Sequence, residues 1–185
     1  LKSIISEACK SGVIAVQVNS NVKNINPIEA EKSYLEAYEI KKLQQTKCND
    51  REIKKLFLFM IFTGLRYSDA VSLKSENITI DSNGNNILKF RQSKTKKLQI
   101  IPLADQAYNL IKFELHKKEN LFSSLNYSSN LNKKLQNWIE SAEIQKKITF
   151  HCARHTFATL NLTAVTDIYT VSKLLGHKSV KTTEV

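Results

Sequence analysis

The feature that most constrains the fold of this chain is a change in hydrophobic period near its middle. Most of the sequence carries apolar residues at three- and four-residue spacing, which is typical of amphipathic helices. Within residues 77–101 the pattern changes to short β-branched and apolar runs, separated by an Asp-Ser-Asn-Gly-Asn turn and by a basic turn. These runs are 78–80, 87–90 and 98–101. The chain is therefore predicted to be a mainly helical α+β protein with a small three-stranded antiparallel sheet.

Local signals predict where several helices begin and end. Residues 50–63 are the strongest candidate, because Asp50 can cap the first turn and Gly64 can adopt the left-handed conformation that ends a helix. Asp167 and Gly176 bracket the last candidate in the same way. A short helix is predicted to begin at residue 67 or 68, and further helices over residues 35–45, 104–116, 128–142, 151–164 and 167–175.

The first 45 residues predict a tail, a linker and the start of the main domain. An apolar stripe that stops at Gly12 is typical of the last helix of a preceding domain, and the Asn-rich stretch 19–30 is typical of a linker. The helix at 35–45 is expected to turn Leu35, Tyr38 and Leu43 inward. We interpret residues 1–18 as the tail of a preceding domain, 19–34 as a linker and 35–185 as the main domain. Because the first residues are already periodic, we expect the chain to be a piece of a longer protein.

The charge of the chain predicts a polyanionic partner. The 185 residues carry a net charge of +11 and a pI near 9.5, which makes nucleic acid the leading candidate. Most of this charge is on lysine, whose attraction to backbone phosphate does not depend on base sequence. The cysteines match no zinc spacing and the sequence has no long apolar run, so we expect reduced thiols inside the cell and no membrane span.

Two histidines and an arginine lie close together at the start of an apolar-periodic segment. On a helix His151 and Arg154 share a face, and His155 joins them one turn after His151. A half-buried cluster of these groups repels itself unless an anion lies among them, and the guanidinium fork matches two phosphate oxygens. Taken alone, the motif is equally consistent with a solvated helix face and a packed histidine.

Four segments in register extend this interpretation. Thr63-Gly64-Leu65-Arg66-Tyr67-Ser68-Asp69, Lys94 in a hairpin turn, His151-x-x-Arg154-His155 and Leu174-Leu175-Gly176-His177 together resemble the tyrosine recombinase family, also called phage-type integrases. The resemblance runs from residue 35 to the end of the chain. It implies a site-specific DNA recombinase or integrase with its catalytic domain at 35–185, and it makes residues 1–18 the tail of the core-binding domain.

The resemblance also implies the chemistry. In this family a tyrosine attacks a backbone phosphodiester, a 3′-phosphotyrosyl intermediate forms and a 5′-hydroxyl leaves, without a cofactor or a metal. Negative charge grows on the free phosphate oxygens, so catalysis depends on placed cations and proton transfer. The resemblance assigns Arg66 and Arg154 to the free oxygens and His151 to the proton of the tyrosine. It assigns His177 to a hydrogen bond with a phosphate oxygen, and Lys94 to protonation of the leaving oxygen.

Residues around these five receive supporting roles by the same resemblance. Asp69 and His155 are expected to orient the catalytic groups, although Asp69 is as consistent with an ordinary charge at a helix start. Lys96 and Lys97 are alternatives to Lys94, which is preferred because of its register with Pro102. Contacts with DNA are expected from Arg66, Lys94, Thr95, Lys96, Arg154 and Lys178.

The nucleophile is the point at which the sequence departs from the family pattern. The pattern H-x-x-x-x-T-T-x-x-Y starts at His177 and places the tyrosine at position 186, one beyond Val185. We expect an active parent enzyme and an inert fragment, with a natural pseudo-enzyme as the alternative. The tyrosines within the chain fall at no nucleophile position: 34, 38, 67, 108, 127 and 169.

The resemblance predicts partners and a cellular setting as well. They are double-stranded DNA and a homo-tetramer in the synaptic complex, with accessory DNA-bending proteins as further candidates, in the bacterial cytoplasm at the nucleoid. Residues 150–183 resemble integrases of mobile genetic elements, while a chromosome-dimer resolvase or a DNA-inversion enzyme uses the same catalytic residues. Two other classes stay open: a non-catalytic DNA-binding regulator that retains the fold, and a basic RNA-binding helical domain.

Overall fold

The computed structural model describes residues 2–13, 33–116, 119–122, 125, 129–177 and 179–183. The chain divides into two compact units, residues 1–31 and 32–185. In the first unit, helix α1 (Lys2–Lys10) is followed by Gly12 in the left-handed conformation, as predicted. Most of the expected linker lies outside the described residues, so the assignment of domains stays a prediction.

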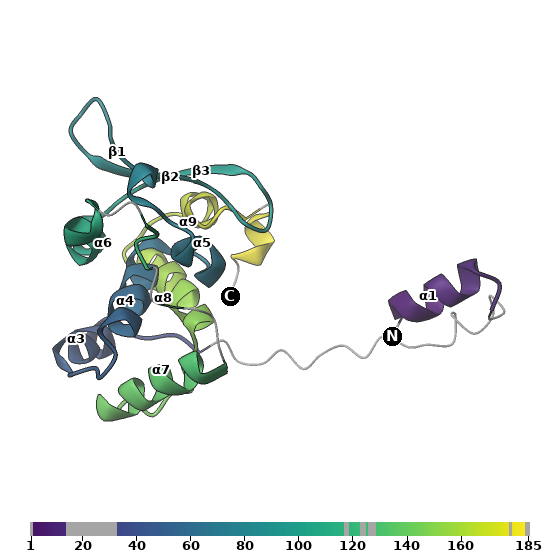
Figure 1. The fold of residues 1–185 in the computed structure, drawn as a ribbon, viewed down its shortest axis with the longest axis horizontal. Coiled ribbons are helices and arrows are strands. Elements are labelled where there is room, and N and C mark those ends of the chain that lie inside the picture. The colour runs from purple at the N-terminus through teal and green to yellow at the C-terminus, as the bar shows by residue number, and fades with distance from the viewer. Residues whose placement is uncertain are drawn as a thin grey trace. The chain divides into compact units, whose positions relative to one another are not determined.

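The second unit is mainly helical and contains one three-stranded antiparallel sheet, which confirms the predicted fold class (Figure 1). The strands are β1 (Ile78–Ile80), β2 (Asn86–Arg91) and β3 (Leu98–Pro102), in the order β1-β2-β3. The α-helices are α3 (Ala37–Gln45), α4 (Arg51–Thr63), α5 (Tyr67–Val71), α6 (Asp105–Ile111), α7 (Ser129–Ser141), α8 (Phe150–Thr163) and α9 (Ile168–Leu175). Short 3₁₀ helices are η1 (Ser75–Asn77), η2 (Lys112–Glu114) and η3 (Val180–Thr182).

The predicted helix caps are present. Asp50 accepts a hydrogen bond from the backbone N–H of Ile53 at 3.3 Å, and Gly64 ends α4 with φ 67°. Asp167 accepts from the N–H of Thr170 at 2.9 Å, and Gly176 ends α9 with φ 66°. These local signals therefore fix the ends of the two helices that border the candidate site.

The prediction for residues 35–45 was wrong in one respect. Helix α3 begins at Ala37, and Tyr38, which was expected to face inward, is 64% exposed. Ile40 and Leu43 are buried. Tyr38 lies two positions before Ile40, which places it on the opposite face of the helix. Leu35 is buried as expected, but it precedes the helix, where its N–H donates to the hydroxyl of Thr156 at 3.0 Å.

Helix α4 is the centre of the core. Its residues 56–61 are all at most 3% exposed, so the helix is covered on every side, including by α6, α7 and α8. The Phe57 ring packs edge to face against Trp138 and Phe150, at centroid distances of 6.3 and 5.9 Å. In Figure 1 the sheet lies above α5 and α9, and α4 and α8 pass through the middle. The end of α4 is therefore held rigidly where the Gly64–Arg66 segment leaves it.

The hairpin between β2 and β3 projects residues 92–97 from the sheet. Strand β2 pairs along its length with β3, from Ile87 opposite Pro102 to Arg91 opposite Leu98. The turn before β2 is closed by Asp81, whose carboxylate accepts two backbone N–H bonds within residues 83–85. Among the residues described, no helix has the length and apolar character needed to cross a membrane.

Candidate active site

Arg154 is buried in α8 and joins the ends of two other helices. Its side chain donates from Nη1 to the carbonyl oxygen of Gly64 at 2.8 Å and from Nη2 to that of Leu175 at 2.6 Å. These carbonyls lie at the C-terminal ends of α4 and α9, where unpaired carbonyl groups carry partial negative charge. A guanidinium has five N–H donors, so donors remain for a ligand after these two bonds.

Arg66 lies in the extended segment between α4 and α5 and is incompletely paired. Its Nη1 is 3.8 Å from Oδ2 of Asp69, and within the described part of the chain this nitrogen is buried without a hydrogen-bond partner. A buried donor left in this state costs about 1–3 kcal/mol. Asp69 is 2% exposed, and its Oδ1 accepts a bond from the backbone N–H of Ser93 at 2.7 Å. Arg66 therefore has an N–H available for a further acceptor in addition to its ion pair with Asp69.

His151 lies in the first turn of α8 with its side chain exposed. Its ring meets the ring of His155 edge to face, with centroids 4.9 Å apart, so the two histidines share a face as predicted. Partial burial and the charges of Arg154 and Arg66 lower the pKa of His151 below its ordinary value. The lowered pKa favours the neutral imidazole, which is the form able to accept a proton.

His177 follows the stop of α9 and is held by a residue near the end of the described chain. Its Nδ1 lies 2.8 Å from the hydroxyl oxygen of Thr183, which is 2% exposed. Burial, followed by the charges of Arg154, Arg66 and His155, lowers the pKa of His177 to about 4. His177 follows Leu175 by two residues, and the carbonyl oxygen of Leu175 accepts the bond from Arg154.

One cavity brings three of the predicted catalytic side chains together. It has a volume of about 250 Å³, and Arg66, His151 and Arg154 line it. The other lining residues are Met60, Leu65, Tyr67, Asn132, Thr149 and Phe150. Burial and the charge of Arg66, partly offset by Asp69, lower the pKa of Arg154 to about 10, so its guanidinium stays charged at neutral pH. Two cations thus share one buried carboxylate, which favours an anionic ligand.

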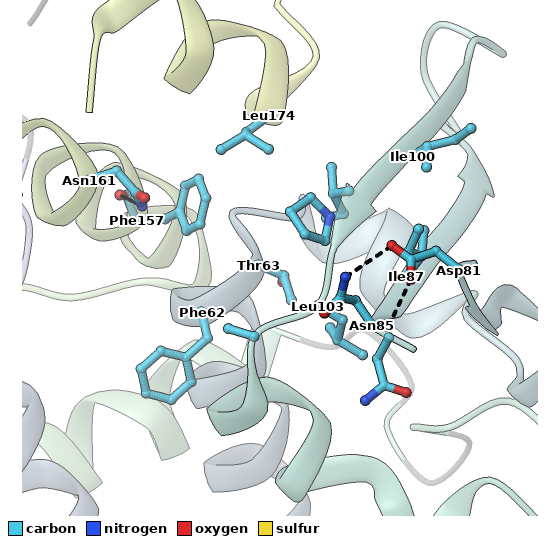
Figure 2. Close-up of a pocket in the computed structure, with 14 residues that line it drawn as sticks. Phe62, Thr63, Asp81, Asn85, Ile87, Ile100, Leu103, Phe157, Asn161 and Leu174 are labelled. Carbon is cyan, nitrogen blue, oxygen red and sulfur yellow. Dashed lines mark hydrogen bonds between the residues drawn. The ribbon is translucent and has the colours of Figure 1, made fainter. Parts of the chain in front are cut away.

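A second cavity, of about 550 Å³, is larger but chemically unsuited to an anion. Figure 2 shows it between the sheet and the side chains of Phe157 and Leu174, with Asp81 and Asn85 at one edge. None of its 14 lining residues is a lysine, arginine or histidine. We therefore assign the site to the smaller, cationic cavity.

The remaining predicted site residues lie on the β2–β3 hairpin or outside the described residues. Lys94 is exposed in the turn, and the described contacts do not bring its ammonium group onto the cationic cavity. Thr95 is half-buried, while Lys96 is exposed and has a left-handed backbone with φ 57°. Lys178 lies outside the described residues. The structure therefore gathers Arg66, Asp69, His151, Arg154, His155 and His177, and leaves the hairpin lysines at the rim of the unit.

Three supporting contacts could not be predicted from the sequence. They are the hydroxyl of Thr183 on His177, the N–H of Ser93 on Asp69, and a hydrogen bond between the buried side chains of Gln92 and Gln99. Ser93 contributes only its backbone N–H, and threonine and glutamine are common at exposed positions, so no sequence signal marks these contacts. The first two support the predicted residues His177 and Asp69 directly, and the third packs on Gly176.

The chain is similar in sequence to known proteins. The model of the phage integrase family matches residues 33–185. Tyrosine recombinase XerA of Saccharolobus solfataricus is 30% identical over 140 residues, which cover 75% of this chain and 46% of that protein. Tyrosine recombinase XerC of Chlamydia caviae is 29% identical over 153 residues, covering 76% of this chain and 47% of that protein. The chain thus spans slightly less than half the length of these relatives.

Solved structures share the fold. The crystal structure of XerA recombinase matches with a TM-score of 0.68 and 24% identity, covering 99% of this chain and 67% of that chain. The structure of a lambda integrase (75–356) dimer bound to a COC′ core site matches with a TM-score of 0.78 and 21% identity, covering 98% of this chain and 70% of that chain. With the family match over residues 33–185, these findings show that the chain belongs to the phage integrase family, the tyrosine recombinases, and includes their catalytic domain.

Proposed function

We propose that this chain is the catalytic part of a site-specific DNA recombinase or integrase that breaks and rejoins strands through a 3′-phosphotyrosyl intermediate. The observation that carries the proposal is that two guanidinium groups, held in different ways, line one cavity. Arg154 is held rigidly by two helix ends, and Arg66 presents a buried N–H that lacks a partner. Together they offer donors to the two free oxygens of a phosphodiester, as an oxyanion-stabilising site must.

The proposed reaction is a displacement at phosphorus. The bond between the tyrosine oxygen and phosphorus forms while the bond from phosphorus to the 5′-oxygen breaks. Neutral His151 takes the tyrosine proton, and Lys94 supplies a proton to the 5′-oxygen. Since the phosphoester energy is retained in the phosphotyrosyl bond, a 5′-hydroxyl can reverse the step and rejoin a strand.

His177 and Thr183 have a further part in this proposal. When the Thr183 hydroxyl donates to Nδ1 of His177, the ring proton lies on Nε2. A neutral imidazole in this tautomer donates a hydrogen bond to a phosphate oxygen without adding a third full charge. This assigns Thr183 the role of fixing the tautomer of His177.

The partner in the proposal is double-stranded DNA. The net charge of +11 favours contact with backbone phosphates, from Lys94, Thr95, Lys96 and Lys178 in addition to the two arginines. A homo-tetramer that synapses two duplexes, accessory DNA-bending proteins and a cytoplasmic, nucleoid-associated role in a bacterial mobile element complete the proposal.

A nicked suicide substrate tests the chemistry in the full-length protein. We expect a denaturant-resistant adduct that maps to a tyrosine after Val185. Arg66→Ala should abolish the adduct while duplex binding is largely kept, because this substitution breaks no helix contact. Arg51→Ala, at an exposed arginine that starts α4, is the matched control and should form the adduct normally. Tyr67→Phe should also form it, since Tyr67 lines the cavity but packs on Phe150.

Other outcomes favour other functions. Tight, salt-sensitive duplex binding without an adduct would favour the non-catalytic DNA-binding regulator. Normal adduct formation by Arg66→Ala would refute the assignment of Arg66 to the phosphate. An adduct that disappears in Tyr67→Phe would make Tyr67 the nucleophile.

A further inference from the structure

Two glutamine side chains are buried beside the cationic site and contact each other. Gln92, directly after β2, is 2% exposed, and Gln99, in β3, is 9% exposed. The side-chain amide of Gln92 donates to Oε1 of Gln99. Gln99 in turn donates from Nε2 to two backbone carbonyl oxygens near the end of α9, those of Lys173 at 3.0 Å and Leu174 at 2.7 Å. The hairpin is thereby bonded to the last turn of α9.

The direction of these bonds follows from the groups at the end of the series. Backbone carbonyl oxygens only accept, so Gln99 must turn its NH₂ toward α9 and its Oε1 toward Gln92. Gln92 must then donate with Nε2, which leaves its own Oε1 to accept. The hydroxyl of Thr95 donates to that oxygen at 2.6 Å. The series Thr95–Gln92–Gln99–α9 is therefore directional, and each internal amide both donates and accepts.

Gly176 provides the surface on which the two amides lie. A Cβ atom at this position would be 2.1 Å from Nε2 of Gln92 and 2.1 Å from Oε1 of Gln99. The amides thus pack on the backbone that joins Leu175, whose carbonyl holds Arg154, to His177. A shift of the amide pair would move this backbone, and with it two members of the proposed catalytic set.

The other end of the series reaches Lys94. Its neighbour Ser93 is bonded through its N–H to Asp69, and its neighbour Thr95 is bonded to Gln92. Lys94 is therefore held between two anchored residues, although its own side chain is exposed. The side chains of Lys96 and Lys97 are exposed as well, and backbone bonds close the turn on Gln92: the N–H of Lys96 donates to the Gln92 carbonyl oxygen at 2.8 Å, and the N–H of Gln92 donates to the Lys97 carbonyl oxygen at 2.9 Å.

We propose that the Gln92–Gln99 amide pair is a positioning device that fixes the Lys94 turn relative to the Arg154–His177 segment. The proposal rests on the proposed function, because it gives the pair a role only where Lys94 protonates a leaving 5′-oxygen. In this arrangement Gln92 and Gln99 touch no DNA. Through the hydrogen bonds between these buried amides, the position of the Lys94 turn depends on the position of α9.

The test changes the leaving atom, which distinguishes a defect in the proposed general acid from a defect elsewhere in the site. In a suicide substrate with sulfur in place of the bridging 5′-oxygen, the leaving thiolate needs no proton, so a misplaced acid no longer limits cleavage. Gln92→Leu keeps the side-chain size and removes both amide bonds. Its single-turnover cleavage of ordinary DNA should fall on the order of tenfold to a hundredfold, a part of the about 10²- to 10⁴-fold that a general acid contributes. Its cleavage of the sulfur substrate should stay close to that of the unsubstituted protein.

Four companion variants make the result specific. Lys94→Ala should show the same rescue by sulfur, and Arg66→Ala should be defective on both substrates. Gln136→Leu is the matched control, because Gln136 also donates to a backbone carbonyl and accepts a backbone N–H, but it does so between α7 and residues 146–148. It should cleave both substrates normally. Thr95→Val breaks only the last bond of the series and should reproduce a smaller form of the Gln92→Leu pattern, even if Gln92→Leu does not fold.

The outcomes distinguish the two proposals. The positioning role would be overturned if Gln92→Leu and Thr95→Val lost cleavage rate equally on both substrates. It would also be overturned if both variants cleaved ordinary DNA normally. Absence of any adduct with the unsubstituted full-length protein on either substrate would instead overturn the proposed function. Sulfur rescue confined to Lys94→Ala would support the general acid and refute the role of the glutamines.

Discussion

Gly176→Ala perturbs the contact on which the candidate site depends most closely. Gly176 has φ 66°, and an added Cβ would lie 2.1 Å from atoms of both Gln92 and Gln99. Gly84 is the matched control, since it has φ 83° and an added Cβ would meet nothing within 4 Å. Both substitutions strain the backbone, and only the first one also disrupts buried amides.

The two costs can be worked out separately. A non-glycine residue in the left-handed region costs about 1–2 kcal/mol, which is the whole expected effect of Gly84→Ala. At Gly176 the displaced amides add about 1–3 kcal/mol, because buried polar groups lose partners. The expected difference between the two variants is thus about 2 kcal/mol. For a unit of this size it corresponds to a melting temperature lower by about 4–8 °C in Gly176→Ala than in Gly84→Ala.

The single tryptophan provides the assay. Trp138 is 3% exposed in the core of residues 32–185, so its fluorescence reports the unfolding of that unit. Thermal and urea unfolding of both variants should be followed by this signal. If the two variants were destabilised equally, the amide pair would have moved aside for the methyl group without loss of stability, and the packing argument at Gly176 would be wrong.

Three further predictions concern charge, protons and the core. Asp69→Asn keeps an acceptor for the N–H of Ser93 but removes the charge beside Arg66, so single-turnover cleavage should fall on the order of tenfold to a hundredfold with little change in duplex affinity. The pKa of His177 is about 4 without DNA, and a bound phosphate raises it toward the ordinary 6.5. The complex then binds more protons than the free protein, so duplex affinity at constant ionic strength should rise as pH falls from 6.5 toward 4, and less so in His177→Asn. Phe57→Ala should lower the free energy of unfolding by about 3–5 kcal/mol, measured by urea titration.

What the sequence could predict depended on the range of the interactions. Asp50, Gly64, Asp167 and Gly176 could be placed because capping involves residues within one turn. The strands followed from their composition and from the turn at 81–85. The pairing of His151 with His155 followed from helical spacing alone.

What could not be predicted depended on packing between distant segments. Whether a glutamine in a strand is exposed or buried depends on what covers the sheet, and Gln99 is covered by a helix end 74 and 75 residues away. Tyr38 was misplaced because Leu35 precedes α3 and bonds to Thr156 of α8, so the spacing from Leu35 to Tyr38 is not helical spacing. The contact between Thr183 and His177 is local, but it lies in a turn whose sequence has no apolar periodicity from which it could be predicted.

The site is therefore built from junctions between elements, which has a consequence for its mechanics. Arg154 bonds the ends of α4 and α9, and Gln99 bonds the end of α9 to the hairpin that carries Lys94. A displacement of α9 would therefore strain the bonds that hold Arg154 and the Lys94 turn together, while Gly64 and Asp69 hold the same two groups from the α4–α5 side. Because a misplacement of about 1 Å can cost on the order of a hundredfold in rate, substitutions that shift α9 should control the cleavage rate without touching the phosphate. Measuring sulfur rescue in variants of α9 would locate that control, since a displaced acid is rescued and a displaced Arg154 is not.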